Sequence, residues 1–335
     1  MIGIPYLAPL LHTPDGVRLS CFLLPQTREC LVSGYTSGPV PDERVVLTPA
    51  AAEARATVIV FHGNSAQNWE DMQTPKDLFE MRCNVFLLSY RGWHVGRDTK
   101  REGYVVRAVL ENLRLRAGAA GLRIDAQTAL DYILSQPYLA ATPIVVYGHS
   151  LGGGVAIDLA SRNPTKIAAI IVSNTFTSIP DIVRRWPHIG MFAFVCHQKW
   201  PSAQRLESVP PTTPILMLSG RRDEIIAPEL MDQLWAAARK RGRLRRSGVA
   251  LCGGCNSGRN VDELEVHPEG DLFVEIETGT HNDTPVDPAY WDAVRQFICG
   301  LPMQKVVHIP DPGPDMSVDD TRWRYVNQDI EVICL

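Results

Sequence analysis

Residues 148–152 read Gly-His-Ser-Leu-Gly and lie between an apolar run, 143–148, and a segment with helical periodicity, 155–163. This G-x-S-x-G pattern is typical of a serine on a sharp strand-to-helix turn, where the residues two before and two after it have no room for side chains. The helix that follows directs backbone N–H groups toward an anion formed beside the serine. We therefore predict Ser150 as a nucleophile, in an elbow formed by Gly148, His149 and Gly152. The alternative is a glycine-rich turn that only packs helix on strand.

A nucleophilic serine needs a base, and the base needs a carboxylate that orients it. In chains with this motif the order is serine, then acid, then histidine. Asp223 follows the apolar run 214–220, and His281 follows the apolar run 271–277. We predict Asp223 as the acid and His281 as the base. Glu224 and Asp283 are the alternatives for the acid.

Two backbone N–H groups are expected to hold the oxyanion that forms when a serine attacks a carbonyl. One is that of Leu151, directly after the nucleophile. The other comes from the loop after the run 57–62, and we place it at Asn64 or its neighbour Ser65. In the same region His62 is predicted to support this loop, and His149 to lie beside the reaction path. This chemistry needs no metal ion and no organic cofactor.

These residues must be positioned by a common scaffold, and the pattern of apolar runs predicts one. Each run has the length of a strand buried on both faces, as in a parallel sheet; the runs are 57–62, 84–90, 143–148, 167–173, 214–220 and 271–277. Segments with helical periodicity lie between them, at 125–136 with Asp125 as N-cap, at 155–163, and at 228–241 with a proline in the first turn. An Asp15-Gly16 pair between alternating residues predicts a β-hairpin before the sheet.

Alternating strands and helices predict an α/β fold with a mostly parallel, doubly wound sheet and helices on both faces. In such sheets ligands bind beyond the carboxyl ends of the strands. Ser150, Asp223 and His281 all follow predicted strands, so we expect them to meet at that edge. Together with the elbow motif, this arrangement predicts the α/β-hydrolase fold.

The composition excludes several other classes of protein. The 335 residues carry a net charge of −4, so no positive field favours nucleic acid, and no nucleic-acid partner is predicted. The eight cysteines do not form the framework of a short secreted chain, which indicates reduced thiols and an intracellular protein. No apolar run reaches the ~18–20 residues that span a bilayer, so the chain as written is expected to be soluble. No oligomeric state is predicted.

Seven segments together resemble alpha/beta-hydrolase domain-containing protein 13 and its fungal bud-emergence relatives. They are IDAQTALDYI (124–133), YGHSLGG (147–153), AIDLASRNP (156–164), NTFTSIPD (174–181), CHQKW (196–200), LSGRRDEI (218–225) and GTHNDT (279–284). The resemblance covers most of residues 10–300 and implies a serine hydrolase with Ser150, Asp223 and His281 as its triad. It also implies cleavage of acyl esters or protein-palmitoyl thioesters, and anchoring to an endomembrane or the plasma membrane near the N-terminus. We expect this chain as written to lack that anchor segment and to make peripheral membrane contact.

We predict one hydrolase domain over residues 1–300, with a short helical cap at 174–208 and a C-terminal extension at 301–335. The cap carries five aromatic residues that either line an apolar acyl pocket or serve only in packing; they are Phe176, Trp186, Phe192, Phe194 and Trp200. The extension is rich in Pro and Asp at HIPDPGPDM and is expected to lie outside the core.

Two segments depart from the family pattern, at 93–120 and 241–271. The first is predicted to form a helix around Val105–Leu115. The second opens on a basic run, which we interpret as a solvated loop rather than a site for nucleic acid or acidic lipid; the run is Arg239, Lys240, Arg241, Arg243, Arg245 and Arg246. A single Cys252-x-x-Cys255 pair lacks the second pair of a structural zinc site. Translated intron sequence would explain both insertions and predicts irregular loops without new sites.

The sequence thus predicts a serine hydrolase that cleaves acyl esters or thioesters of small molecules or lipidated proteins. A serine peptidase is one alternative, because the same three residues cleave amides. A catalytically impaired membrane-trafficking scaffold is another, because the 241–271 insertion lies between Asp223 and His281 and could displace the histidine.

Overall fold

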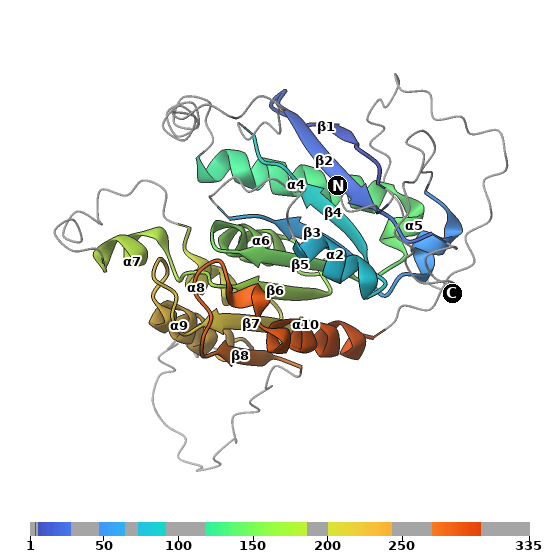
Figure 1. Ribbon diagram of the computed structural model, residues 1–335. Coiled ribbons are helices and arrows are strands. Elements are labelled where there is room, and N and C mark those ends of the chain that lie inside the picture. Colours follow the sequence, from blue (N-terminus) through green and yellow to red (C-terminus); the bar gives the residue numbers. More distant parts are fainter. Residues whose placement is uncertain are drawn as a thin grey trace, which may run out of the picture.

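The computed structural model describes residues 4, 6–27, 47–63, 73–91, 118–185, 200–242 and 270–302. Its strands form one sheet in the order β1-β2-β4-β3-β5-β6-β7-β8 (Figure 1). The strands are β1 (Leu10–His12), β2 (Arg18–Leu24), β3 (Thr57–Phe61), β4 (Asn84–Leu88), β5 (Ile144–His149), β6 (Ala169–Ser173), β7 (Ile215–Gly220) and β8 (Leu272–Ile276). All six predicted strands are confirmed, with ends that differ from the apolar runs by at most two residues.

The helices lie between the strands, as the alternating pattern predicted. They are α2 (Gln73–Glu80), α4 (Ala119–Ser135), α5 (Pro137–Ala140), α6 (Leu151–Arg162), α7 (Ile179–Arg184), α8 (Ser202–Leu206), α9 (Pro228–Ala238) and α10 (Pro288–Gly300), with short 3-10 helices at Pro49–Glu53 and Thr284–Val286. Of the predicted cap, the described residues form the two short helices α7 and α8.

The sheet is antiparallel only at its beginning. Strands β1 and β2 form the predicted hairpin, and β2 pairs antiparallel with β4. From β4 to β8 every neighbouring pair is parallel. The carboxyl ends of β5, β6, β7 and β8 therefore lie next to one another at one edge, where the α/β architecture places ligand sites.

The parallel strands from β3 to β7 are buried on both faces, which explains their apolar sequences. The prediction of a strand buried on both faces is wrong for β8, which is at the edge of the sheet and is only partly buried. In β3, Ile59 and Phe61 pack into one apolar cluster, and Val58 and Val60 pack into another on the opposite face. Helices α4, α6, α8 and α9 cover the first face, and α2 and α10 cover the second (Figure 1). The predicted mostly parallel sheet with helices on both faces is confirmed.

The predicted N-cap at Asp125 is wrong. Helix α4 begins at Ala119 with Gly118 as its N-cap, so Asp125 lies inside the helix and is fully buried. Its carboxylate accepts hydrogen bonds from the Arg91 backbone N–H (2.9 Å) and from Arg91 Nε (2.8 Å). A buried carboxylate is stable when it is paired and hydrogen-bonded. Asp125 therefore joins α4 to the end of β4 instead of capping a helix.

The interpretation of the basic run as a solvated loop is wrong at Arg241. Its guanidinium is fully buried and binds both carboxylate oxygens of Asp271, at 2.7 Å and 2.6 Å. It also donates to the carbonyl oxygens of Pro210 (3.0 Å) and Thr213 (2.8 Å). The first and last residues of the predicted insertion 241–271 thus form a buried ion pair with its polar atoms satisfied.

The other predictions about the insertions and the extension cannot be compared with the structure. The helix predicted at Val105–Leu115, the Cys252 and Cys255 pair and residues 303–335 lie outside the described residues. The same holds for Arg243, Arg245 and Arg246, whereas Arg239 and Lys240 are exposed.

Candidate active site

Ser150 lies at a turn of a single residue between β5, which ends at His149, and α6, which begins at Leu151. Its backbone φ of +54° falls in a region that residues other than glycine rarely adopt. As predicted, the neighbouring positions must be glycine because a side chain there would clash with the backbone. A Cβ on Gly148 would lie 2.2 Å from the Gly152 carbonyl oxygen, and a Cβ on Gly152 would lie 2.0 Å from the Phe61 carbonyl oxygen.

A continuous hydrogen-bonded chain joins Ser150, His281 and Asp223. The distance from Ser150 Oγ to His281 Nε2 is 3.0 Å, and that from His281 Nδ1 to Asp223 Oδ2 is 2.8 Å. In the neutral imidazole, Nδ1–H donates to the carboxylate, which leaves Nε2 free to accept from the serine hydroxyl. All three residues are largely buried, with exposed fractions of 8% for Ser150, 7% for Asp223 and 5% for His281.

The carboxylates near His281 have distinct partners. Asp223 Oδ1 accepts from the backbone N–H groups of Ile225 (2.9 Å) and Ile226 (2.7 Å), which leaves Oδ2 for the imidazole. Glu224 instead accepts from the backbone N–H of His281 (3.2 Å), so it holds the loop rather than the ring. Asp283 is exposed and accepts from the Thr280 hydroxyl at 3.1 Å. Of the three candidate acids, Asp223 is the one that contacts the imidazole.

Of the predicted oxyanion donors, Leu151 lies in the described part of the chain. Leu151 is the first residue of α6, and a backbone N–H at this position has no acceptor within the helix. Asn64 and Ser65 lie outside the described residues. The described chain reaches Gly63, where an added Cβ would be 3.3 Å from Ser150 Cβ. The loop after β3 therefore passes directly beside the serine.

Two further histidines surround this arrangement. The ring of His149 lies beside that of His281, with centroids 4.9 Å apart. Burial, and to a smaller extent the charge of His281, lowers the pKa of His149 to about 3. His62 forms a 2.7 Å hydrogen bond with the Gly63 carbonyl and packs against Tyr90. Burial lowers the pKa of His62 to about 4. Both rings are therefore neutral at pH 7.

Two residues with no predicted role, Asn174 and Thr175, contact the loops and the turn that carry the three side chains. The carboxamide of Asn174 bonds to backbone atoms of the Asp223 and His281 loops. The Thr175 hydroxyl donates to the Ser150 carbonyl at 2.7 Å. Both residues belong to the NTFTSIPD segment, and their position at the end of a buried strand is the signal that could have identified them.

Further along that segment, Ser178 and Asp181 form the N-terminal capping contacts of helix α7. Ser178 is the N-cap of α7 and accepts from the Asp181 backbone N–H. The Asp181 carboxylate in turn accepts from the hydroxyls of Thr177 (2.7 Å) and Ser178 (2.6 Å).

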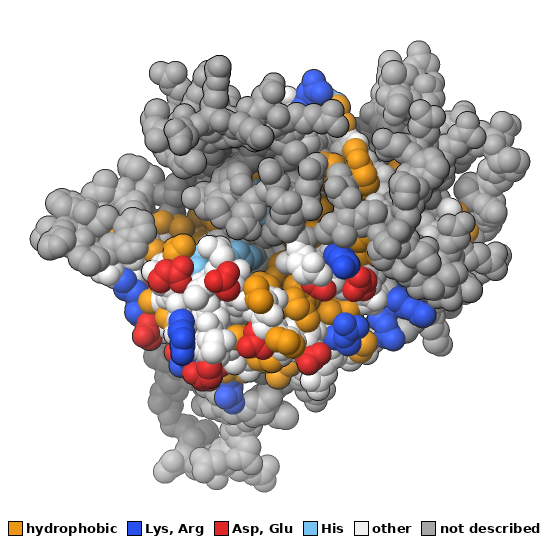
Figure 2. All heavy atoms as spheres, in the orientation of Figure 1, with side chains coloured by type: hydrophobic (Ala, Val, Ile, Leu, Met, Phe, Trp, Pro, Cys, Tyr) orange, Lys and Arg blue, Asp and Glu red, His pale blue; other side chains and the backbone are white. Residues whose placement is uncertain are grey.

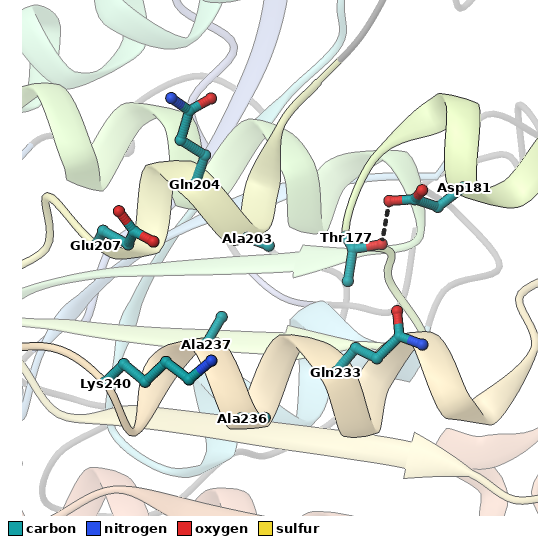
Figure 3. A pocket seen from close by; sticks show the side chains of 9 residues that line it. All are labelled: Thr177, Asp181, Ala203, Gln204, Glu207, Gln233, Ala236, Ala237 and Lys240. Carbon is teal, nitrogen blue, oxygen red and sulfur yellow. Dashed lines mark hydrogen bonds between the residues drawn. The ribbon is translucent and has the colours of Figure 1, made fainter. Parts of the chain in front are cut away.

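Of the predicted cap aromatics, the two described ones serve in packing. Phe176 and Trp200 are buried in the apolar cluster beneath α6 and α8; Trp186, Phe192 and Phe194 lie outside the described residues. A cavity of about 490 Å³ between α7, α8 and α9 is lined by polar side chains with three alanines (Figure 3); the polar ones are Thr177, Asp181, Gln204, Glu207, Gln233 and Lys240. This lining does not match an apolar acyl pocket.

The insertion 241–271 does not displace the histidine. His281 lies ten residues after Asp271, which is anchored to Arg241, and its ring still reaches both Ser150 and Asp223.

On the face drawn in Figure 2, histidine side chains reach the surface between apolar and acidic ones. Within the described part of the chain, no three His, Cys, Asp or Glu residues are grouped as metal ligands.

Known proteins resemble this chain in sequence and in fold. A family model described as "Serine aminopeptidase, S33" matches residues 52–211. Protein bem46 of Schizosaccharomyces pombe is 30% identical over 260 residues, which cover 77% of this chain and 72% of bem46. The alpha/beta hydrolase domain-containing protein WAV2 of Arabidopsis thaliana is 27% identical over 304 residues, which cover 86% of this chain and 77% of WAV2.

Among solved structures, the Pyrococcus furiosus esterase Pf2001 aligns with a TM-score of 0.56 at 16% identity, over 90% of this chain and 94% of the esterase. The predicted α/β-hydrolase fold is confirmed. No helix in the described ranges is both long enough and apolar enough to cross a bilayer.

Proposed function

Since this chain belongs to the bem46 family of α/β-hydrolase domain proteins, we propose that it is a serine hydrolase that cleaves acyl esters or thioesters. The observation that carries the proposal is the hydrogen-bonded chain from Ser150 Oγ through the His281 ring to the Asp223 carboxylate. Hydrogen bonds between nucleophile, base and acid are what activation of a serine requires.

The mechanism follows from these contacts. Ser150 Oγ attacks the acyl carbonyl while His281 Nε2 takes the hydroxyl proton. Asp223 holds the ring in the tautomer with a proton on Nδ1 and stabilises the imidazolium. The oxyanion forms beside the N–H of Leu151, and we assign the second donor to Asn64. His281 then protonates the leaving alcohol or thiol, and water, activated by the same ring, releases the acid and restores Ser150.

Esters and thioesters are the proposed substrates because the resemblance to alpha/beta-hydrolase domain-containing protein 13 and its fungal bud-emergence relatives implies them. A lipidated protein at a membrane surface is one form that such a substrate takes. A serine peptidase is the second candidate, and the description of the matching family model, "Serine aminopeptidase, S33", favours it. A catalytically impaired scaffold is the alternative from another class.

Hydrolysis assays with the full chain test the proposal. The substrates are p-nitrophenyl esters from acetate to palmitate, a palmitoyl thioester, and aminoacyl p-nitroanilides. Ser150→Ala is compared with Ser161→Ala, which removes a hydroxyl at the other end of α6 that donates to the Asp158 carbonyl.

We expect ester or thioester turnover in the wild type and in Ser161→Ala, and a loss of about 10⁶-fold in kcat in Ser150→Ala, as for other triad serines. Turnover of the anilides alone would favour the peptidase. A folded wild type with no turnover, or equal turnover in Ser150→Ala, would contradict the serine-hydrolase assignment.

A further inference from the structure

We propose that Asn174 is a positioning residue that joins the loop carrying the acid to the loop carrying the base, an inference that rests on the proposed function. Asn174 follows the last residue of β6, and β6 lies between β5, which ends beside Ser150, and β7, which precedes Asp223. Its side chain is buried, with 1% of the residue exposed. It thus lies between the strands that carry the reacting groups.

One end of the Asn174 carboxamide binds the last residue of β7, where the acid loop begins. Its Oδ1 accepts from the backbone N–H of Gly220 at 2.8 Å. The Gly220 carbonyl in turn accepts from the backbone N–H of Asp223 at 3.3 Å. This oxygen therefore holds the turn in which the Asp223 carboxylate is presented to the histidine.

The other end of the carboxamide binds the histidine loop. Nδ2 donates to the carbonyl oxygens of Thr280 (3.1 Å) and His281 (3.0 Å) and to Thr284 Oγ1 (2.8 Å). One side chain therefore connects the backbone next to the acid with the backbone of the base itself. These two loops are 58 residues apart in sequence and are separated by the 241–271 insertion.

Asparagine suits this position for two reasons. Its φ is +45°, a conformation that asparagine, aspartate and glycine adopt more readily than other residues. It also presents an acceptor toward an N–H group and donors toward two carbonyls. Aspartate has the same shape but only acceptors when ionised, so it would set a carboxylate oxygen against the Thr280 and His281 carbonyls.

The next residue, Thr175, contacts the backbone of the nucleophile in a similar way. The Thr175 hydroxyl binds the Ser150 carbonyl, and a Cβ on Gly153 would lie 2.5 Å from Thr175 Cβ, so the elbow packs tightly on it. The two adjacent side chains thus contact the backbone of the nucleophile, of the acid loop and of the base. Because attack requires near-ideal geometry, displacement of a reacting group by about 1 Å costs about 10²-fold in rate.

Two substitutions test Asn174 while retaining its backbone conformation. Asn174→Asp retains the shape and removes the donors, and Asn174→Gly removes the whole carboxamide. The matched control is Asn163→Asp, at the far end of α6, where Nδ2 also donates to a carbonyl (Leu159, 2.9 Å) and to a second oxygen (Gln127 Oε1, 2.9 Å). All variants are assayed on one ester, at a temperature at which circular dichroism shows that they are folded.

We expect kcat to fall about 10²-fold in both Asn174 variants, with KM unchanged, and to stay at the wild-type value in Asn163→Asp. The rate of labelling by a fluorophosphonate should fall with kcat. In proton NMR spectra, the far-downfield signal of an imidazole N–H bonded to a carboxylate should weaken in the Asn174 variants. This signal reports on the His281–Asp223 contact without substrate.

If one Asn174 variant does not fold, the other and the NMR signal decide the question. If neither folds while Asn163→Asp does, the residue has a general structural role and the proposal is overturned. Wild-type kcat and an unchanged NMR signal in a folded Asn174 variant would overturn it while leaving the proposed function intact. Absence of any Ser150-dependent reaction in the wild type would overturn both.

Discussion

The two oxygens of Asp223 have separate tasks. Oδ1 is held by the N–H groups of Ile225 and Ile226, and this fixes Oδ2 at 2.8 Å from His281 Nδ1. The neighbouring Glu224 is exposed, and backbone hydrogen bonds, including that of the His281 N–H, lower the pKa of its carboxyl. The two adjacent carboxylates therefore act on different atoms of the same histidine.

Substitution of these two acids by their amides should separate their roles. Asp223→Asn replaces the acceptor opposite His281 Nδ1–H and favours the wrong tautomer, so kcat should fall by about 10⁴-fold. Glu224→Gln keeps an oxygen that accepts from the His281 N–H, so kcat should change by less than about tenfold. Steady-state kinetics on an ester substrate measures both values. Comparable losses in the two variants would contradict the assignment of Asp223 as the acid.

Between α9 and β8, the buried Arg241–Asp271 pair anchors the path of the chain toward the histidine. Asp271 also accepts from the backbone N–H of Ile215, at the start of β7. Gly242 and Gly270, which lie inside the insertion next to Arg241 and Asp271, both have a positive φ, of 76° and 86°. The pair therefore fixes where β8 begins beside β7, and so where the chain leads into the His281 loop.

Removal of the guanidinium should destabilise the fold strongly. Arg241→Met removes the guanidinium from the Asp271 carboxylate and from the Pro210 and Thr213 carbonyl oxygens, and breaking such a buried pair costs about 3–5 kcal/mol. Arg239→Met makes the same change at an exposed position two residues earlier and should cost less than about 0.5 kcal/mol. Urea unfolding followed by circular dichroism gives both free energies of unfolding. Equal stabilities of the two variants would refute the structural role of the pair.

For the molecule as a whole, the buried histidines link the free energy of unfolding to pH. Burial holds the pKa of His62 at about 4 when the chain is folded, against 6.5 as its ordinary value. Between these values the unfolded chain binds a proton that the folded chain does not. The contribution of His62 to stability is therefore complete above pH 6.5 and is lost as pH falls from 6.5 toward 4.

The wild type should lose about 1.4 kcal/mol of stability per pH unit from this residue over that window. His62→Phe retains an aromatic ring against Tyr90 but cannot be protonated, so its stability should depend less steeply on pH. The same substitution at the exposed His12 is the control. Chemical unfolding at pH 7, 6 and 5 measures the slopes. A slope in His62→Phe as steep as in the wild type would show that His62 does not cause the pH dependence.

The predictability of this protein from sequence depends on how local each interaction is. The central strands were found because burial on both faces makes β3 to β7 uniformly apolar, and Ser150 because the elbow needs glycines at fixed distances. His281 and Asp223 followed from the rule that sites lie at the carboxyl ends of strands. Each of these signals lies within a few consecutive residues.

The errors concern partners far apart in the chain. Asp125 has the residue type and position of a helix cap, but its partner is Arg91, 34 residues earlier. Arg241 belongs to a basic run, but its partner is Asp271, 30 residues later. Asn174 binds atoms 46 and 107 residues away. The local sequence around one partner does not identify the other, because the two come into contact only when the chain is folded.

Labelling with a fluorophosphonate, followed by peptide mapping, tests the central claim most directly. The probe reacts with a serine only where a base and an oxyanion site are assembled around it. We predict one adduct per folded chain, on Ser150, that is absent after heat denaturation and in Ser150→Ala. A folded wild type that acquires no adduct, or one that acquires it on another residue, would contradict the claim that Ser150, His281 and Asp223 form a working active site.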